Sequence, residues 1–180
     1  RYQTLFARNE GAVIGPAAGF HFSRELLLRM EIRDIHKAFI TVHNGLGNYR
    51  DIDVEDLTKY KMESEQIIIP EEACTIVNKA SDAGRNICAV GTSTLRAMET
   101  ASGTQRHMKP FDGWTSRFIF PPYEFNVPNR LVTNLHMSKS ILLMMAAAFG
   151  GYEHVMHAYS VAIKEKYRFG AYGDAMFILD

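Results

Sequence analysis

Hydrophobic and polar positions along the chain follow a pattern that predicts short apolar strands separated by helices. Three apolar runs, 37–43 (KAFITVH), 86–90 (NICAV) and 131–136 (LVTNLH), are rich in residue types typical of strands, and each leads into a polar turn. The second run is followed by the helix-like stretch TLRAMETAS, and the third by a helix that begins near Ser138. The same unit, a strand followed by a turn and a helix, is therefore predicted three times.

Two further helices have clear signals at their ends. The stretch from Pro70 to Gly84 starts with a proline and two glutamates, which suit a first helical turn, and ends on a glycine, which suits a C-terminal cap. In 152–168 the apolar positions recur about every 3.6 residues, which predicts a helix covering the sheet. The polar segment 103–115 (GTQRHMKPFDGWT) is predicted to be a mobile loop. Strands alternating with helices predict an α/β fold with a mainly parallel sheet and covering helices, either open or part of a barrel.

The composition is that of one ordinary globular domain. The chain has 180 residues, 47% of them hydrophobic and 22% charged, and its twenty basic and twenty acidic side chains cancel. Contacts with a nucleic acid must therefore come from local patches and not from an overall field. The longest apolar run, 141–149, is much shorter than the roughly 20 residues that span a bilayer, so we expect no membrane contact. Cys74 and Cys88 lack metal-ligand spacing and are expected to be buried, reduced thiols, which favours a cytoplasmic protein.

Polar clusters lie where strands are predicted to end. These clusters are 17–23 (AAGFHFS), 43–47 (HNGLG), 91–96 (GTSTLR) and 133–139 (TNLHMSK). Ligands of parallel α/β folds bind at the carboxyl ends of strands, where loops and helix N-termini offer free N–H groups. In GTSTLR, Gly91, the hydroxyls of Thr92 and Ser93 and the helix start suit an anion or a carboxylate. The alternative is a simple hydroxyl cap with Arg96 on an exposed helix face.

Three histidines fall at or near predicted strand ends. His21, His43 and His136 could converge on one pocket as acid, base or hydrogen-bond donor, although a single histidine is more often structural. We expect His43 and His136 to share that pocket with Arg96 and Asn134, because each follows or ends a strand of one parallel sheet. We expect no metal site, since these loops contain no short-spaced pair of ligands. The common hydrolase, nucleotide-phosphate and dinucleotide motifs are also missing from the sequence.

Six blocks resemble, in order and essentially from end to end, the S-adenosylmethionine:tRNA ribosyltransferase-isomerase family of queuosine biosynthesis. They are AAGFHFS, HNGLGNYRDI, KMESE, AVGTSTLRAMET, TNLHMSKSILLMMAAAFGG and YRFGAYGDAM. Several positions depart from the usual pattern. Asn44, Tyr49 and Glu63 replace common residues, with valine usual at 44 and histidine at 63, and YRFGAYGDAM has Gly-Ala where Phe-Ser is usual. The resemblance implies a two-domain molecule in which a small β-barrel domain interrupts an α/β barrel-like domain. The resemblance implies that residues 1–180 are the C-terminal part of the barrel-like domain, without its N-terminal strands and without the inserted β-barrel, because the opening RYQTLFA resembles the point of re-entry.

The resemblance also implies an activity. The family transfers the ribosyl group of S-adenosylmethionine to 7-aminomethyl-7-deazaguanine in a tRNA with a queuosine-type anticodon. The ribosyl group isomerises to give epoxyqueuosine, adenine and methionine are released, and no metal is needed. We expect the candidate site residues to divide into catalytic (His43, His136, His21), cofactor-binding (Gly91, Thr92, Ser93, Arg96, Asn134) and substrate-binding (Lys139, Tyr172, Asp174) groups.

Two alternatives remain open: a non-catalytic module that docks S-adenosylmethionine or tRNA, and an unrelated α/β barrel enzyme that binds a phosphorylated metabolite at 91–96. We also expect the chain to be inactive alone and to form a homo-oligomer through unpaired strand edges.

Overall fold

A computed structural model describes residues 2–103 and 106–179 of the chain. The strands are β1 (Thr41–His43), β2 (Glu65–Ile69), β3 (Cys88–Val90), β4 (Phe111–Thr115), β5 (Arg130–Asn134) and β6 (Ala175–Leu179). The α-helices are α1 (Arg24–Ile32), α2 (Glu71–Asp82), α3 (Thr92–Ser102), α4 (Ile141–Gly150) and α5 (Tyr152–Lys164). Three short 3-10 helices, η1 (Ala17–His21), η2 (Leu46–Tyr49) and η3 (Leu57–Lys59), lie in the loops. The molecule is a mixed α/β domain, as the alternating pattern predicts.

The strands form two separate three-stranded sheets, and the expected mainly parallel sheet is wrong. The first sheet has the order β1-β2-β4 and is antiparallel throughout. In the second sheet, of order β3-β5-β6, only β3 and β5 run parallel, and β6 pairs antiparallel with β5. The described residues close no barrel. The prediction failed because the sequence pattern did not reveal β2, β4 and β6, each of which runs antiparallel to a neighbour.

The segment 103–115 contains β4 at its end and is not the continuous loop that was expected; residues 104 and 105 lie outside the described part. Its strand FDGWT contains Asp112 and Gly113, which are rare in strands, and Trp114 is exposed on the outer face, so the strand lacks an apolar alternation. It is held by its register with β2, from Phe111 opposite Ile69 to Thr115 opposite Glu65. The pairing partner, and not the local sequence, specifies this strand.

The helices match their sequence signals more closely. Helix α2 follows Pro70, has Glu71 and Glu72 in its first turn, and ends just before Gly84, whose φ is +62°. Helix α5 buries Val155, Tyr159 and Ala162 on one face, as its period predicts. The unit predicted after 37–43 differs, because β1 is followed by the short η2 and not by an α-helix.

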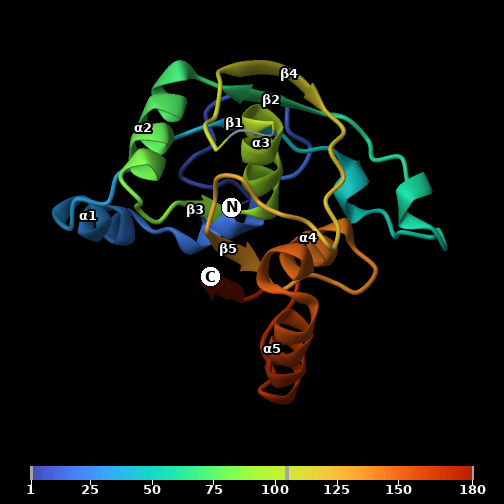
Figure 1. Cartoon of the computed structure of the whole chain (residues 1–180). Coiled ribbons are helices and arrows are strands. Elements are labelled where there is room, and N and C mark those ends of the chain that lie inside the picture. The colour runs from blue at the N-terminus through green and yellow to red at the C-terminus, as the bar shows by residue number, and fades with distance from the viewer. Residues whose placement is uncertain (1, 104–105, 180) are drawn as a thin grey trace.

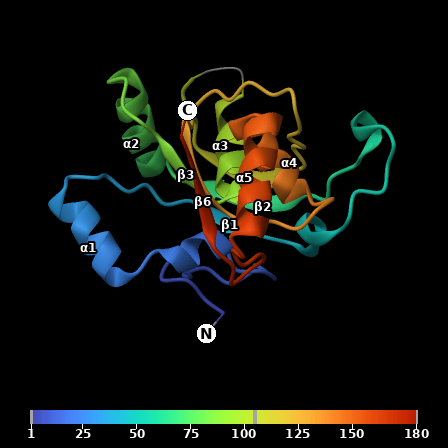
Figure 2. The ribbon, with the colours of Figure 1, turned by 90° about the horizontal axis from the view of Figure 1, so that it is seen from below.

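The main hydrophobic core lies around α3, which runs between the two sheets (Figure 1). Leu95 and Ala97 of α3 pack in one cluster with Ile67 of β2, Ala89 of β3 and Leu131 of β5. By contrast, α1 has no buried residue and stands away from the body of the molecule in both views (Figures 1 and 2). Because the core holds α3 against both sheets, the N-terminal end of this helix has a fixed position relative to them.

The two cysteines are in different environments. Cys74 in α2 is buried, as expected, whereas Cys88 at the start of β3 is exposed, so its predicted burial is wrong. Its side chain lies on the face of the second sheet opposite Ala89, which is completely buried. In the described part of the chain, no helix has the length and apolar character needed to cross a membrane.

Candidate functional site

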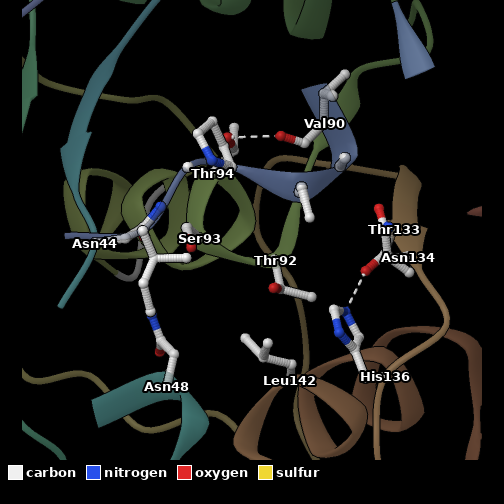
Figure 3. A pocket seen from close by; sticks show the side chains of 16 residues that line it. Asn44, Asn48, Val90, Thr92, Ser93, Thr94, Thr133, Asn134, His136 and Leu142 are labelled. Carbon is white, nitrogen blue, oxygen red and sulfur yellow. Dashed lines mark hydrogen bonds between the residues drawn. The ribbon is translucent and has the colours of Figure 1, made fainter. Parts of the chain in front are cut away.

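Two connected hollows lie at the N-terminal end of α3. A narrow cavity of about 40 Å³ is lined by 14–18, Asn44, Asn48, 90–94, Thr133, Asn134, His136 and Leu142. A wider cleft of about 370 Å³ is lined by Ala17, Asn48, Asp51, Asn134, 136–140, Leu142, Gly170 and Ala171. The two share Ala17, Asn48, Asn134, His136 and Leu142, so they form one site. Figure 3 shows Asn44 and Asn48 on one side of the narrow cavity, His136 and Asn134 on the other, and Thr92 and Ser93 between them.

The start of α3 brings Gly91, Thr92 and Ser93 to this site, as the sequence predicts. Gly91 has a φ of +95°, a conformation that side-chain-bearing residues rarely adopt, and this lets β3 turn directly into the helix. No side chain caps the helix start, and the first helical bond runs from the Leu95 N–H to the Gly91 carbonyl at 3.0 Å. The preceding backbone N–H groups therefore form a donor set with partial positive charge at the cavity.

His136 contributes a neutral imidazole. Its Nε2 lies 2.8 Å from Thr133 Oγ1, and its backbone N–H donates to the Tyr159 hydroxyl at 2.8 Å. Burial lowers the pKa of His136 from 6.5 to about 4, because the charged form loses hydration. At pH 7 the ring can accept a proton or form hydrogen bonds, but it does not carry a charge.

Asn134 and His21 hold each other at the edge of the site. Asn134 Oδ1 lies 3.2 Å from His21 Nε2, and Asn134 Nδ2 donates to the Gly170 carbonyl at 3.0 Å. The amide of Asn134 is thus engaged at both ends by protein groups. Although Asn134 lines both hollows, it acts here as a link between η1, β5 and the loop at 170.

Arg96 is placed behind the site, where it does not line either hollow. Its side chain is 1% exposed and forms an ion pair with Glu65, which is 3% exposed. Burial lowers the pKa of Arg96 to about 10, which leaves it charged at pH 7. Arg96 Nη1 donates to Asn48 Oδ1 at 3.3 Å, while Glu65 Oε1 accepts from Asn48 Nδ2 at 2.7 Å and from the Gly45 N–H at 2.8 Å. The pair therefore fixes the loop that forms the Asn48 wall.

His43 does not line either hollow, and the reason given for grouping it with His136 is wrong. His43 ends β1 in the antiparallel sheet, whereas His136 follows β5 in the other sheet. The ring packs against Gly11, where a Cβ atom would come within 2.6 Å of His43 Nδ1. His43 Nδ1 is buried without a hydrogen-bond partner among the described residues. Its neighbour in the chain, Asn44, is the residue that reaches the cavity.

Of the three expected substrate-binding residues, only Lys139 lines one of the two hollows, and Tyr172 and Asp174 follow the cleft residue Ala171 in the chain. Lys139 lines the wider cleft. Tyr172 is 62% exposed and stacks on Phe20 with ring centroids 5.6 Å apart. Asp174 accepts hydrogen bonds from the backbone and guanidinium of Arg168 at 2.7 and 2.8 Å, and these bonds lower the pKa of Asp174. Both carboxylate oxygens of Asp174 therefore bind Arg168 and stabilise the turn between these two residues.

Sequence reasoning missed Asn44 and Asn48, which line the narrow cavity opposite His136. Both belong to HNGLGN, a block that had been recognised for its histidine and glycines. The sequence does not show that β1 delivers the residue after His43 to the start of α3. Among the described residues, no group of three or more His, Cys, Asp or Glu side chains is arranged to hold a metal ion.

Comparison with known proteins gives a consistent result. The model of the family described as "Queuosine biosynthesis protein" matches residues 1–178. The chain is 64% identical over 180 residues to an S-adenosylmethionine:tRNA ribosyltransferase-isomerase of Phocaeicola vulgatus, covering 100% of this chain and 51% of that protein. The protein of the same name in Cytophaga hutchinsonii is 52% identical over 179 residues, 99% of this chain and 51% of the relative.

A solved structure is also similar. The crystal structure of S-adenosylmethionine tRNA ribosyltransferase from Thermotoga maritima matches with a TM-score of 0.74 and 35% identity, over 90% of this chain and 51% of that one. The chain spans about half the length of the curated relatives it matches. With a family match over nearly every residue and relatives above 60% identity, this chain belongs to the queuosine biosynthesis protein family.

Proposed function

We propose that the chain is part of an S-adenosylmethionine:tRNA ribosyltransferase-isomerase. The observation that carries this proposal is the family match over residues 1–178, together with relatives of that name at up to 64% identity. The reaction is the transfer and isomerisation of the ribosyl group of S-adenosylmethionine onto 7-aminomethyl-7-deazaguanine in tRNA, which forms epoxyqueuosine. S-adenosylmethionine is consumed as a co-substrate, and we propose that no metal takes part.

The proposed chemistry needs a base for the acidified proton beside the sulfonium, an acid at the departing adenine, and exclusion of water. We propose that His136 forms hydrogen bonds to the co-substrate, because its ring is neutral and half-buried at the cavity. Its lowered pKa makes it a weak base, so it could remove only a strongly acidified proton. Gly91, Thr92 and Ser93 are suited to hold S-adenosylmethionine through the start of α3. Arg96 and Asn134 support the site from behind and from its edge, and do not supply free ligand groups.

The wider cleft is the proposed place for the tRNA nucleotide. Lys139 lines it, and Tyr172, next to the cleft residue Ala171, presents an exposed ring on which a base could stack. A tRNA substrate implies a cytoplasmic location. We propose that residues 1–180 are the C-terminal part of a barrel-like domain, and that the half of the relatives' length not represented here supplies the remaining walls.

The test measures adenine release from S-adenosylmethionine in the presence of tRNA that carries the deazaguanine precursor. The full-length protein that contains this chain is expected to release adenine only when that tRNA is present. The 180-residue chain alone is expected to release none above background, because catalytic geometry tolerates only about 0.5 Å of error and one side of the site is missing. A folded full-length protein that releases no adenine contradicts the proposed function. Release by the isolated chain near the full-length rate contradicts its incompleteness.

A further inference from the structure

Asn44 has an unusual environment for an amide side chain. It is 5% exposed and lines the narrow cavity, yet its Oδ1 has no hydrogen-bond partner among the described residues. Its backbone carbonyl, in contrast, accepts from the Val13 N–H at 2.9 Å. A buried acceptor without a donor is costly to a folded protein, so such a group calls for a missing partner. The missing partner must carry a hydrogen-bond donor and must fit the narrow cavity.

Whereas Asn44 needs a hydrogen-bond donor, the start of α3 needs an acceptor. The N–H groups of Thr92, Ser93 and Thr94 precede the first helical bond, and no side chain caps them. Uncapped N–H groups at the start of an 11-residue helix favour a negatively charged acceptor such as a carboxylate. The narrow cavity, of about 40 Å³, has room for a compact polar group but not for a purine ring. A small group that combines an anionic acceptor with a nearby donor would satisfy both requirements at once.

We propose that the narrow cavity binds the α-amino acid end of S-adenosylmethionine, with its carboxylate at the start of α3 and its ammonium donating to Asn44 Oδ1. The proposal rests on the proposed function and names which part of the co-substrate enters which part of the site. An α-amino acid group carries a carboxylate and an ammonium on one carbon, which matches the two requirements of the cavity. The adenosyl part then extends from the narrow cavity into the wider cleft, where it meets the tRNA nucleotide proposed to bind beside Lys139 and Tyr172.

Asn44→Val is a suitable test, because valine removes the amide and suits the end of a strand. Valine is common at this position in the family that the chain resembles, so the Asn44 contact strengthens a site that family members with valine also possess. Calorimetry on the full-length protein would compare S-adenosylhomocysteine, which keeps the amino acid end, with 5′-methylthioadenosine, which lacks it. Asn44→Val is expected to weaken S-adenosylhomocysteine roughly 10- to 100-fold, the effect of losing a hydrogen bond to a charged group. Affinity for 5′-methylthioadenosine is expected to change by less than about twofold, since the lost contact is absent from that ligand.

Asn86→Val is the matched control, because Asn86 is exposed and lies outside both hollows. It is expected to change neither affinity. The proposal is overturned if Asn44→Val weakens both ligands equally, or weakens neither. It is also overturned if inorganic phosphate displaces S-adenosylhomocysteine from the unmodified protein but not from the Asn44→Val variant, since the cavity would then be a phosphate site.

Free L-methionine separates this proposal from the proposed function. If the full-length protein binds L-methionine in an Asn44-dependent way but binds no adenosyl ligand, the assignment of the narrow cavity stands and the proposed co-substrate is wrong. If it binds neither class of ligand, both proposals are overturned.

Discussion

At the scale of single residues, burial decides the chemistry of His136. The sequence places a titratable ring at a polar loop, and the fold then half-buries it at the cavity. The unfolded chain, with a pKa of 6.5, takes up a proton that the folded chain accepts only near pH 4. Between these values the unfolded state binds more protons, so the free energy of unfolding must fall as the pH falls.

We expect this loss to disappear in the His136→Gln variant, in which the amide keeps a polar group near Thr133 but does not titrate. Urea unfolding between pH 7 and 4 measures the effect, which for this one group is at most about 3 kcal/mol. His157→Gln on the exposed surface of α5 is the control. If the free energy of unfolding depends on pH equally in His136→Gln and in the original chain, the lowered pKa is contradicted.

At the scale of elements, the ion pair of Arg96 and Glu65 connects α3 to β2 and, through Asn48 and Gly45, to the loop that walls the site. The pair was not foreseen, because in the sequence Arg96 looked like a residue on an exposed helix face or in a binding loop. Helical period and end signals are local, which is why α2 and α5 could be predicted. Strand pairing depends on partners far apart in the chain, which is why β4, the antiparallel sheet and the buried arginine could not.

Removing one partner of this pair leaves the other as an uncompensated buried charge. Arg96→Met is expected to destabilise the protein by about 3–5 kcal/mol, measured by chemical unfolding. The double variant Arg96→Met with Glu65→Gln is expected to lose less than the sum of the two single changes, because neither buried charge remains. Arg168→Met, which breaks the exposed pair with Asp174, is the control and should change stability little. Additive losses in the double variant would mean that the two buried side chains act independently.

At the scale of the whole molecule, one face of the second sheet is largely uncovered away from Asn134, where η1 packs against it. The face with Ala89, Leu131 and Ile178 packs against helices, whereas the other face presents Phe177 and Leu179 at 58% and 61% exposure. A sheet containing parallel strands is normally buried on both faces. Because the relatives are about twice as long as this chain, we expect the uncovered face to be an internal surface of the full-length protein.

Cys88 reports on this uncovered face, since it lies opposite Arg130, which in turn lies opposite Leu179. Alkylation by iodoacetamide, followed by mass spectrometry of the Cys88 peptide, is expected to be at least about tenfold slower in the full-length protein than in the 180-residue chain. Buried Cys74 should react slowly in both and serves as the internal reference. Dilution of the isolated chain separates protection by self-association from protection by the missing half. Equal rates for Cys88 in the two proteins would show that this face is a true outer surface.

The position of α3 between the two sheets also determines how the molecule comes apart. Its apolar residues share one cluster with strands of both sheets, so loss of the helix would remove core contacts from both sheets at once. The two sheets are therefore not independent folding units. The helix and the strands of both sheets that pack against it are expected to gain and lose their structure together, and the ligand-binding end of α3 shares the rigidity of that cooperative unit.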